Sequence, residues 1–214
     1  MFLAINGSPR LHGNTATLLE SALEGVISTG RDARMVHLYQ MTYQGCVSCF
    51  SCKRKGGKTF CAFHDGLTPL LHELEECEGI ILGSPIYFMG VTGAMHSFLE
   101  RFIFSHFLYT RKNCWHYPKK VPFALFYTWG ADRSTVEAES RSLHFMETRL
   151  EEMLGTRPEI LHSCESWQFD DYSKYEADMF SPTERWERYR NVFPLECKTA
   201  RKIGEKLATT GTDS

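Results

Sequence analysis

Long apolar runs are missing from this sequence of 214 residues: none approaches the roughly 20 residues that a membrane-spanning helix needs. The N-terminus also lacks the basic segment and the long apolar stretch of a secretory signal peptide. These two absences argue against a membrane partner and against export. We therefore expect a cytoplasmic protein.

An excess of charge of one sign is missing too. Lys and Arg total 24 and Asp and Glu total 26, so the formal net charge is −2. Proteins that bind nucleic acid usually carry a strong basic excess, so this balance argues against that class. Hydrophobic residues make up 43% of the chain, which is enough to build one sizeable core. We predict a single domain over residues 1–214, with a cysteine-rich loop at 44–64 and an insertion near 165–180.

Short apolar segments alternate with segments of helical spacing along the chain. This alternation predicts an α/β fold in which a five-stranded parallel sheet carries helices on both faces. Loops that follow parallel strands share the carboxyl edge of the sheet, where ligands bind. The expected strands are Phe2–Ile5, Arg34–Tyr39, Gly79–Leu82, Pro122–Tyr127 and Glu159–His162, and the expected helices bury Ala16–Ile27, Leu67–Leu74, Val91–Phe102 and Val136–Leu150.

Several residues predict where helices begin or break. Asp65 can cap the helix that follows the cysteine-rich loop. Ser134 and Glu137 form a capping-box pair for one helix that reaches Leu150. A last helical region begins at Ser181, and Pro194 predicts a break in it.

The loop Gly7–Thr15, between the first strand and the first helix, has the composition of an anion site. It contains one Arg and several hydroxyl and amide side chains but no carboxylate. Backbone N–H groups at the helix start, together with Ser8, Arg10, Asn14 and Thr15, suit a phosphate. The alternative is an ordinary loop in which Asn and Thr side chains cap the helix. No GxGxxG follows the strand, so the usual dinucleotide fingerprint is absent.

Eight cysteines in a reducing compartment favour metal ligands, redox groups or core residues over disulfides. Cys46, Cys49 and Cys52 are separated by two residues each, and Cys61 follows after eight more. Such spacing predicts an iron–sulfur cluster, because adjacent turns aim three thiolates at one point. Zinc more often uses two separated CxxC pairs. A [4Fe–4S] cluster, zinc and unmetallated thiols remain the three alternatives.

Three stretches together resemble the NADPH-dependent FMN reductase family of flavodoxin-like proteins. GSPRLHGNTATLLE is similar to its phosphate loop, and GSPIYFMGVTGAMHSFLER, from Gly83 to Arg101, is similar to its second flavin-binding loop. GCVSCFSCKRKGGKTFCAFHDG resembles the cysteine loop of the iron–sulfur flavoprotein branch, whose last gap is usually shorter. The three stretches lie in the family's order and span roughly residues 1–130; beyond them only the order of elements is similar.

The resemblance implies a flavodoxin-like three-layer fold that binds one FMN. A small-residue loop often contacts the flavin after the fourth strand in this family, and Trp129 departs from that pattern. For Tyr87 and Phe88 the alternative is simple packing of the following helix. The residues implied for the phosphate are Ser8, Arg10, Gly13, Asn14 and Thr15, and those implied for the isoalloxazine ring are Ser84, Pro85, Ile86, Tyr87, Phe88 and Met89, with Thr128, Trp129 and Gly130 as a third contact.

The leading hypothesis is an FMN-dependent oxidoreductase that passes electrons from NAD(P)H, or from a reduced carrier such as ferredoxin, to an acceptor. No catalytic acid or base is assigned. One alternative is an iron–sulfur flavoprotein that carries electrons without a small-molecule substrate, and another is a non-catalytic cysteine redox sensor. Because the cysteine loop follows the second predicted strand, we expect it at the same sheet edge as the flavin loops, where electrons could pass between them.

We also expect a homodimer or homotetramer built partly through the helix after Gly90. Met95, Phe98, Phe102, Phe104 and Phe107 exceed what one buried helix face needs, which suits a surface that meets a partner. The alternative is that these side chains fill the core of the monomer.

Overall fold

A parallel sheet forms the centre of the protein, for which a computed structural model describes residues 1–56 and 60–210. Its strand order is β2-β1-β3-β5-β6, and β4 pairs antiparallel with the end of β3 outside this path. The five parallel strands confirm the predicted sheet. Their bounds are β1 (Phe2–Asn6), β2 (Ala33–His37), β3 (Gly79–Tyr87), β5 (Phe123–Thr128) and β6 (Glu159–Ser163), with β4 at Gly90–Val91.

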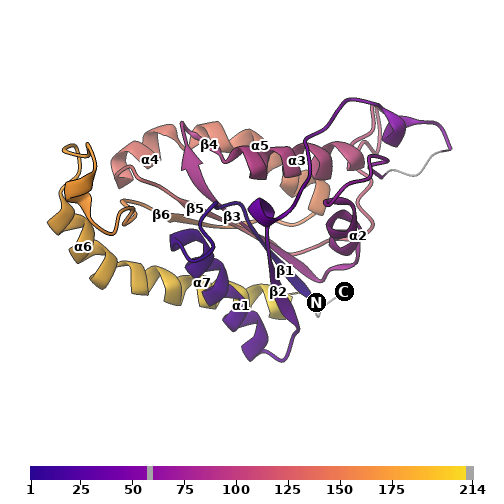
Figure 1. Cartoon of the computed structure of the whole chain (residues 1–214). Helices are drawn as coiled ribbons and strands as arrows, with labels where there is room; N and C mark the ends of the chain where they lie inside the picture. Colours follow the sequence, from indigo (N-terminus) through magenta and orange to yellow (C-terminus); the bar gives the residue numbers. More distant parts are fainter. Residues whose placement is uncertain (57–59, 211–214) are drawn as a thin grey trace.

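Helices cover both faces of the sheet (Figure 1). Successive residues of a strand point to opposite faces, so Leu3 and Ile5 enter one core whereas Phe2 and Ala4 enter the other. The first core includes residues of α2 (Thr68–Glu76), α3 (Gly93–His106) and α5 (Arg141–Leu154), and the second includes residues of α1 (Asn14–Ser28) and α7 (Phe193–Thr210). This arrangement confirms the three-layer fold.

The backbones of α1 and α7 lie in direct contact. A Cβ atom added at Gly25 would stand 2.0 Å from the carbonyl oxygen of Arg201, and one at Gly204 would stand 1.9 Å from that of Ala22. Neither helix could approach so closely with larger residues at these two positions. The glycine pair therefore sets the distance at which α7 closes this face of the sheet.

The apolar stripe of α3 belongs to the monomer's own core. Met95, Phe98 and Phe102 are at most 1% exposed. The prediction that these three side chains form a surface for a partner is therefore wrong. The alternative, that they fill the core of the monomer, is correct for them. Phe104 and Phe107 are half-buried.

Two predicted helix starts are wrong. The helix expected from Ser134 is split into α4 (Arg133–Glu139) and α5, and its cap is Asp132, whose Oδ1 accepts from the N–H of Thr135 at 2.8 Å. An Asp one residue outside the helix is a better cap than a Ser inside it. The helix α2 begins at Thr68, not next to Asp65, because Asp65 forms a turn by accepting from the N–H of Leu67 at 3.0 Å.

The remaining boundaries lie near their predicted places. β2 ends at His37, and a short 3-10 turn at Leu38–Gln40 follows where the strand was expected to continue. The predicted break near Pro194 is confirmed, since α6 (Pro182–Asn191) ends just before α7. In the described part of the chain no helix is long and apolar enough to cross a membrane.

Candidate functional site

The loop after β1 is held in shape by its own side chains. Asn6 is fully buried at the end of the strand, and its Oδ1 accepts from the N–H of Ser8 at 2.9 Å. The Ser8 hydroxyl in turn accepts from the N–H of Arg10 at 3.1 Å. The hydroxyl of Thr92 donates to the carbonyl of Gly7 at 2.7 Å, which ties this loop to the start of α3. The first two predicted flavin loops therefore meet at the carboxyl edge of the sheet.

The start of α1 has no side-chain cap. Its N-cap is Gly13, and its first turn contains no acidic residue. The alternative in which Asn14 or Thr15 caps this helix is wrong, because no side chain caps it. Thr15 Oγ1 pairs with Thr128 Oγ1 at 2.7 Å, and Asn14 Nδ2 donates to the carbonyl of Trp167. Unpaired N–H groups and the positive end of the helix dipole remain, and both favour an anion.

The insertion predicted near 165–180 lies against this loop, and we call Glu165–Phe180 the cover. Arg10 Nη1 donates to the carbonyl of Gln168 at 2.7 Å, and Asn14 Nδ2 donates to the carbonyl of Trp167 at 2.9 Å. Figure 1 shows this segment in orange, next to α6. The sequence did not reveal these contacts, because the acceptors are backbone carbonyls, which every residue has.

The second predicted flavin loop is a hairpin. β3 continues through Ser84 to Tyr87, and Tyr87 pairs with Gly90 of β4. Ser84 is buried, and its hydroxyl accepts from the N–H of Thr92 at 3.1 Å. Part of the expected loop is therefore strand, which gives Ser84, Pro85 and Ile86 fixed positions.

The tip of this hairpin is strained. Phe88 has φ of 48° and Met89 has φ of 63°, so both central residues are left-handed, as in the tight hairpin turns that usually contain Asn-Gly. The Phe88 side chain is 105% exposed, which rules out the alternative that it packs the start of α3. An aromatic residue held left-handed and in solvent is typical of a functional position.

The third predicted flavin contact, Thr128–Gly130, is enclosed by His162 and by the cover. Thr128 and Trp129 are buried, and the indole N–H of Trp129 donates to His162 Nδ1 at 3.1 Å. Because an indole can only donate, Nδ1 is the acceptor, and burial lowers the pKa of His162. A Cβ atom at Gly130 would stand 2.4 Å from Nε2 of Gln168 in the cover. The Trp129 ring thus belongs to the core, and the backbone of this loop is what remains for a ligand.

The four cysteines line one small cavity together with Arg101 and Phe104 of α3. Cys52 is buried, Cys46 and Cys61 are half-buried, and Cys49 is exposed. The N–H of Ser51 lowers the pKa of the Cys49 thiol. Within residues 1–56 and 60–210, no three His, Cys, Asp or Glu side chains are arranged to hold a metal ion. The thiols therefore share a cavity without converging on one point.

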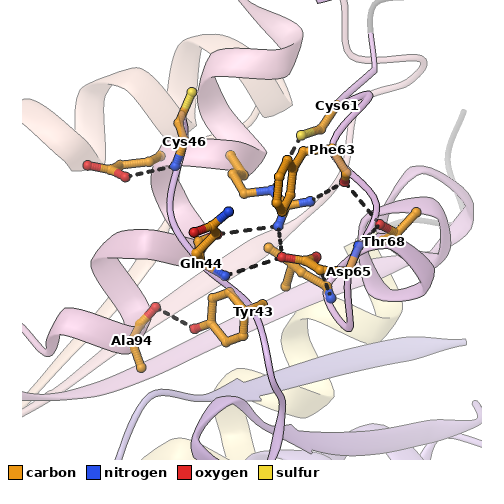
Figure 2. Close-up of polar contacts among 11 residues, drawn as sticks. Tyr43, Gln44, Cys46, Cys61, Phe63, Asp65, Thr68 and Ala94 are labelled. Carbon is orange, nitrogen blue, oxygen red and sulfur yellow. Dashed lines mark hydrogen bonds and ion pairs between the residues drawn. The ribbon is translucent and has the colours of Figure 1, made fainter. Parts of the chain in front are cut away.

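Arg101 closes the neck of the cysteine loop. Its partners there, Gln44, Cys61, Phe63 and Asp65, are labelled in Figure 2. Its side chain is fully buried, and Nη1 stands 2.6 Å from Asp65 Oδ2. Nε donates to Cys61 Sγ at 3.3 Å, and the terminal nitrogens donate to the carbonyls of Phe63 at 2.7 Å and Gln44 at 3.3 Å. Burial alone would raise the pKa of the Asp65 carboxyl, but the hydrogen bonds from Arg101 and two backbone N–H groups lower it. This buried ion pair joins the chain segments that lead into and out of the cysteine loop.

The cysteines lie along α3, away from the sheet edge. The Glu100 carboxylate accepts from the N–H of Cys46 at 3.1 Å. The next residue of α3, Arg101, donates to the Cys61 sulfur. Arg101 follows Thr92 by nine residues, which is about 13 Å of helix. Only the beginning of the loop is at the edge, where the Tyr43 hydroxyl donates to the carbonyl of Ala94 at 2.6 Å. The expectation that the cysteines lie at the flavin edge was wrong, because the loop turns along the helix.

The sequence model of the NADPH-dependent FMN reductase family matches residues 1–151. The chain belongs to this family. The chain is also similar to curated iron–sulfur flavoproteins. One, of Methanocaldococcus jannaschii, is 34% identical over 99 residues, which are 46% of this chain and 50% of the relative. Another, of Archaeoglobus fulgidus, is 33% identical over 101 residues, which are 47% of this chain and 44% of the relative. The chain spans about half the length of these relatives.

Solved structures show the same fold at low sequence identity. An azoreductase of Bacillus anthracis str. Sterne superposes with a TM-score of 0.68 at 14% identity, over 96% of this chain and 98% of that one. An NAD(P)H:quinone oxidoreductase of Methanothermobacter marburgensis superposes with a TM-score of 0.62 at 13% identity, over 96% of this chain and 95% of that one. The family match confirms the family predicted from the sequence. The strand order and these structural likenesses confirm the predicted flavodoxin-like fold.

Proposed function

We propose that this protein binds FMN at the carboxyl edge of the sheet and passes electrons from NAD(P)H, or from a reduced carrier, to an acceptor. The observation that carries the proposal is the uncapped start of α1, with Gly13 as N-cap and no acidic residue in the first turn. Arg10 and Asn14 place a charged and an amide donor beside it. A terminal phosphate needs such a set of donors.

The side chains of the site bind and orient, whereas the electron chemistry belongs to the flavin when it is bound. Ser8, Arg10, Asn14 and Thr15 would hold the phosphate. The bond from Thr92 to Gly7 keeps the phosphate loop in register with the hairpin. The hairpin Ser84–Met89 and the backbone of Thr128–Gly130 would line the ring. No side chain is assigned as a catalytic acid or base.

Arg10→Ala should weaken FMN binding about tenfold or more, since a charge-assisted hydrogen bond contributes about 1.5–3 kcal/mol. Arg10 supplies the only Lys or Arg charge within Gly7–Thr15. Fluorescence titration of the full chain measures the change. Arg31→Ala is the matched control, because Arg31 pairs with Glu78 and should leave the affinity unchanged. Equal affinities for wild type and Arg10→Ala would remove Arg10 from the site.

A second proposal is that the cysteine loop holds a [4Fe–4S] cluster and that the protein acts as an electron carrier. Four thiols around one cavity are a donor set that suits a cluster, and Arg101 Nε donates to the Cys61 sulfur there. The iron–sulfur flavoproteins among the relatives support this proposal. The thiols would have to move closer together to bind it.

Self-association through α3 and α5 is a further part of the proposal. A groove of about 570 Å³ between these helices has a mostly apolar lining, which includes Phe104, Phe107, Tyr109 and Phe145. Tyr109 and Phe145 are 69% and 74% exposed, and large apolar side chains that share one groove suit a surface that meets a partner. We expect light scattering at micromolar concentration to give the mass of a homodimer or homotetramer. The mass of one chain, 24.6 kDa, would contradict this expectation.

A further inference from the structure

The cover contacts Arg10 and Asn14, two of the four side chains that are proposed to bind the FMN phosphate. We propose that it determines flavin specificity: it closes the phosphate end of the site, so that FMN fits and the longer flavin dinucleotide FAD does not. This inference rests on the FMN site proposed above. It adds selectivity for FMN over FAD, and it assigns that selectivity to residues outside the family match, which covers residues 1–151.

The cover presents hydrogen-bond acceptors directly beside the proposed phosphate donors. The carbonyl oxygens of Gln168 and Trp167 stand 2.7 and 2.9 Å from the side-chain nitrogens of Arg10 and Asn14. A terminal phosphate can share these donors with the carbonyls, since Arg carries five N–H groups. A second phosphate that continued outward would meet the carbonyl oxygens, which repel an anion. Rejection by unpaired or repelling groups is a general source of specificity.

The cover is anchored as a fixed part of the fold. Arg185 of α6 is buried, and its terminal nitrogens donate to the carbonyl of Gly130 at 2.6 Å and to that of Ser166 at 3.4 Å. The Trp167 ring packs on Tyr172 at 4.8 Å and on Trp186 at 5.2 Å between centroids. Hydrogen bonds from Arg185 and aromatic contacts therefore hold the cover independently of Arg10.

One polar atom of the cover points independently to a ligand. The Ser166 hydroxyl is buried and has no hydrogen-bond partner among the described residues. Leaving such a group unpaired is unfavourable, so a buried unpaired hydroxyl calls for a ligand or an ordered water. The backbone N–H of Ser166 donates to the carbonyl of Trp129 at 2.9 Å, which places the residue beside the third flavin contact.

The test compares affinities of the full chain for FMN and for FAD by fluorescence titration. Two variants loosen the cover without touching the phosphate donors. Trp167→Gly with Phe169→Gly removes ring packing, including the stack of Phe169 on Tyr175 at 4.3 Å. Arg185→Gln removes the anchor. Arg190→Gln, on the exposed side of the same helix, is the matched control.

We expect wild type and Arg190→Gln to prefer FMN by about a hundredfold, and at least one loosened variant to reduce that ratio about tenfold, mainly through tighter FAD binding. Circular dichroism identifies which variants fold. Equal affinity of wild type for FMN and FAD, or an unchanged ratio in every folded loosened variant, would overturn the role of the cover while leaving the FMN site intact. Wild type that binds neither flavin would overturn both.

Discussion

Replacing Arg101 by Ala should lower the free energy of unfolding by about 3–5 kcal/mol, because it leaves Asp65 as a largely buried charge without its partner. The substitution also leaves the carbonyls of Phe63 and Gln44 without this donor. Urea unfolding followed by circular dichroism measures the loss. Among the ion pairs of the described residues, this pair is the one in which the Arg side chain is fully buried.

Two controls separate the buried ion pair from a general effect of removing Arg. Arg149→Ala removes a half-exposed residue that pairs with Glu152, so the loss should stay below about 1 kcal/mol. Arg101→Met combined with Asp65→Asn should recover part of the stability, because no unpaired charge remains. A loss below about 1 kcal/mol for Arg101→Ala would show that the ion pair does not hold the neck of the cysteine loop.

Cys49→Ala should abolish iron and sulfide in protein prepared without oxygen, while FMN stays bound, if the four cysteines hold a cluster. Three remaining thiolates do not complete the usual four-cysteine set. Iron and sulfide analysis of the purified protein gives the result. Cys114→Ala is the control, since Cys114 lies outside the cysteine loop and should retain full iron. Full iron in Cys49→Ala, or none in fresh wild type, would reject the cluster.

The sequence predicted the sheet well because its central strands are apolar along their whole length. β1 and β5 are buried at every residue, and β3 is buried over its first six. Such runs, alternating with helical spacing, leave few other architectures. The edge strands β2 and β6 are only partly buried, and the end of β2 was placed two residues too far along the chain.

The hairpin turn and the contacts of the cover could not be predicted from single residues. Phe88 and Met89 take a left-handed turn with neither Gly nor Asn, so the usual signal of such a turn is absent. Arg101 was compared with a flavin-loop residue, and its partner Asp65 lies 36 positions away. The cover binds Arg10 through the backbone of Gln168, which has no sequence signature. These features depend on tertiary contacts that composition and spacing do not encode.

The central claim is that FMN binds where the loops after β1, β3 and β5 meet. The most direct test is a fluorescence titration of flavin-free full-length protein with FMN, accompanied by an absorbance spectrum of the complex. We expect saturation at one FMN per chain, two resolved visible flavin bands, and weaker binding in Arg10→Ala. A titration that shows no saturable FMN binding by folded wild-type protein would contradict it.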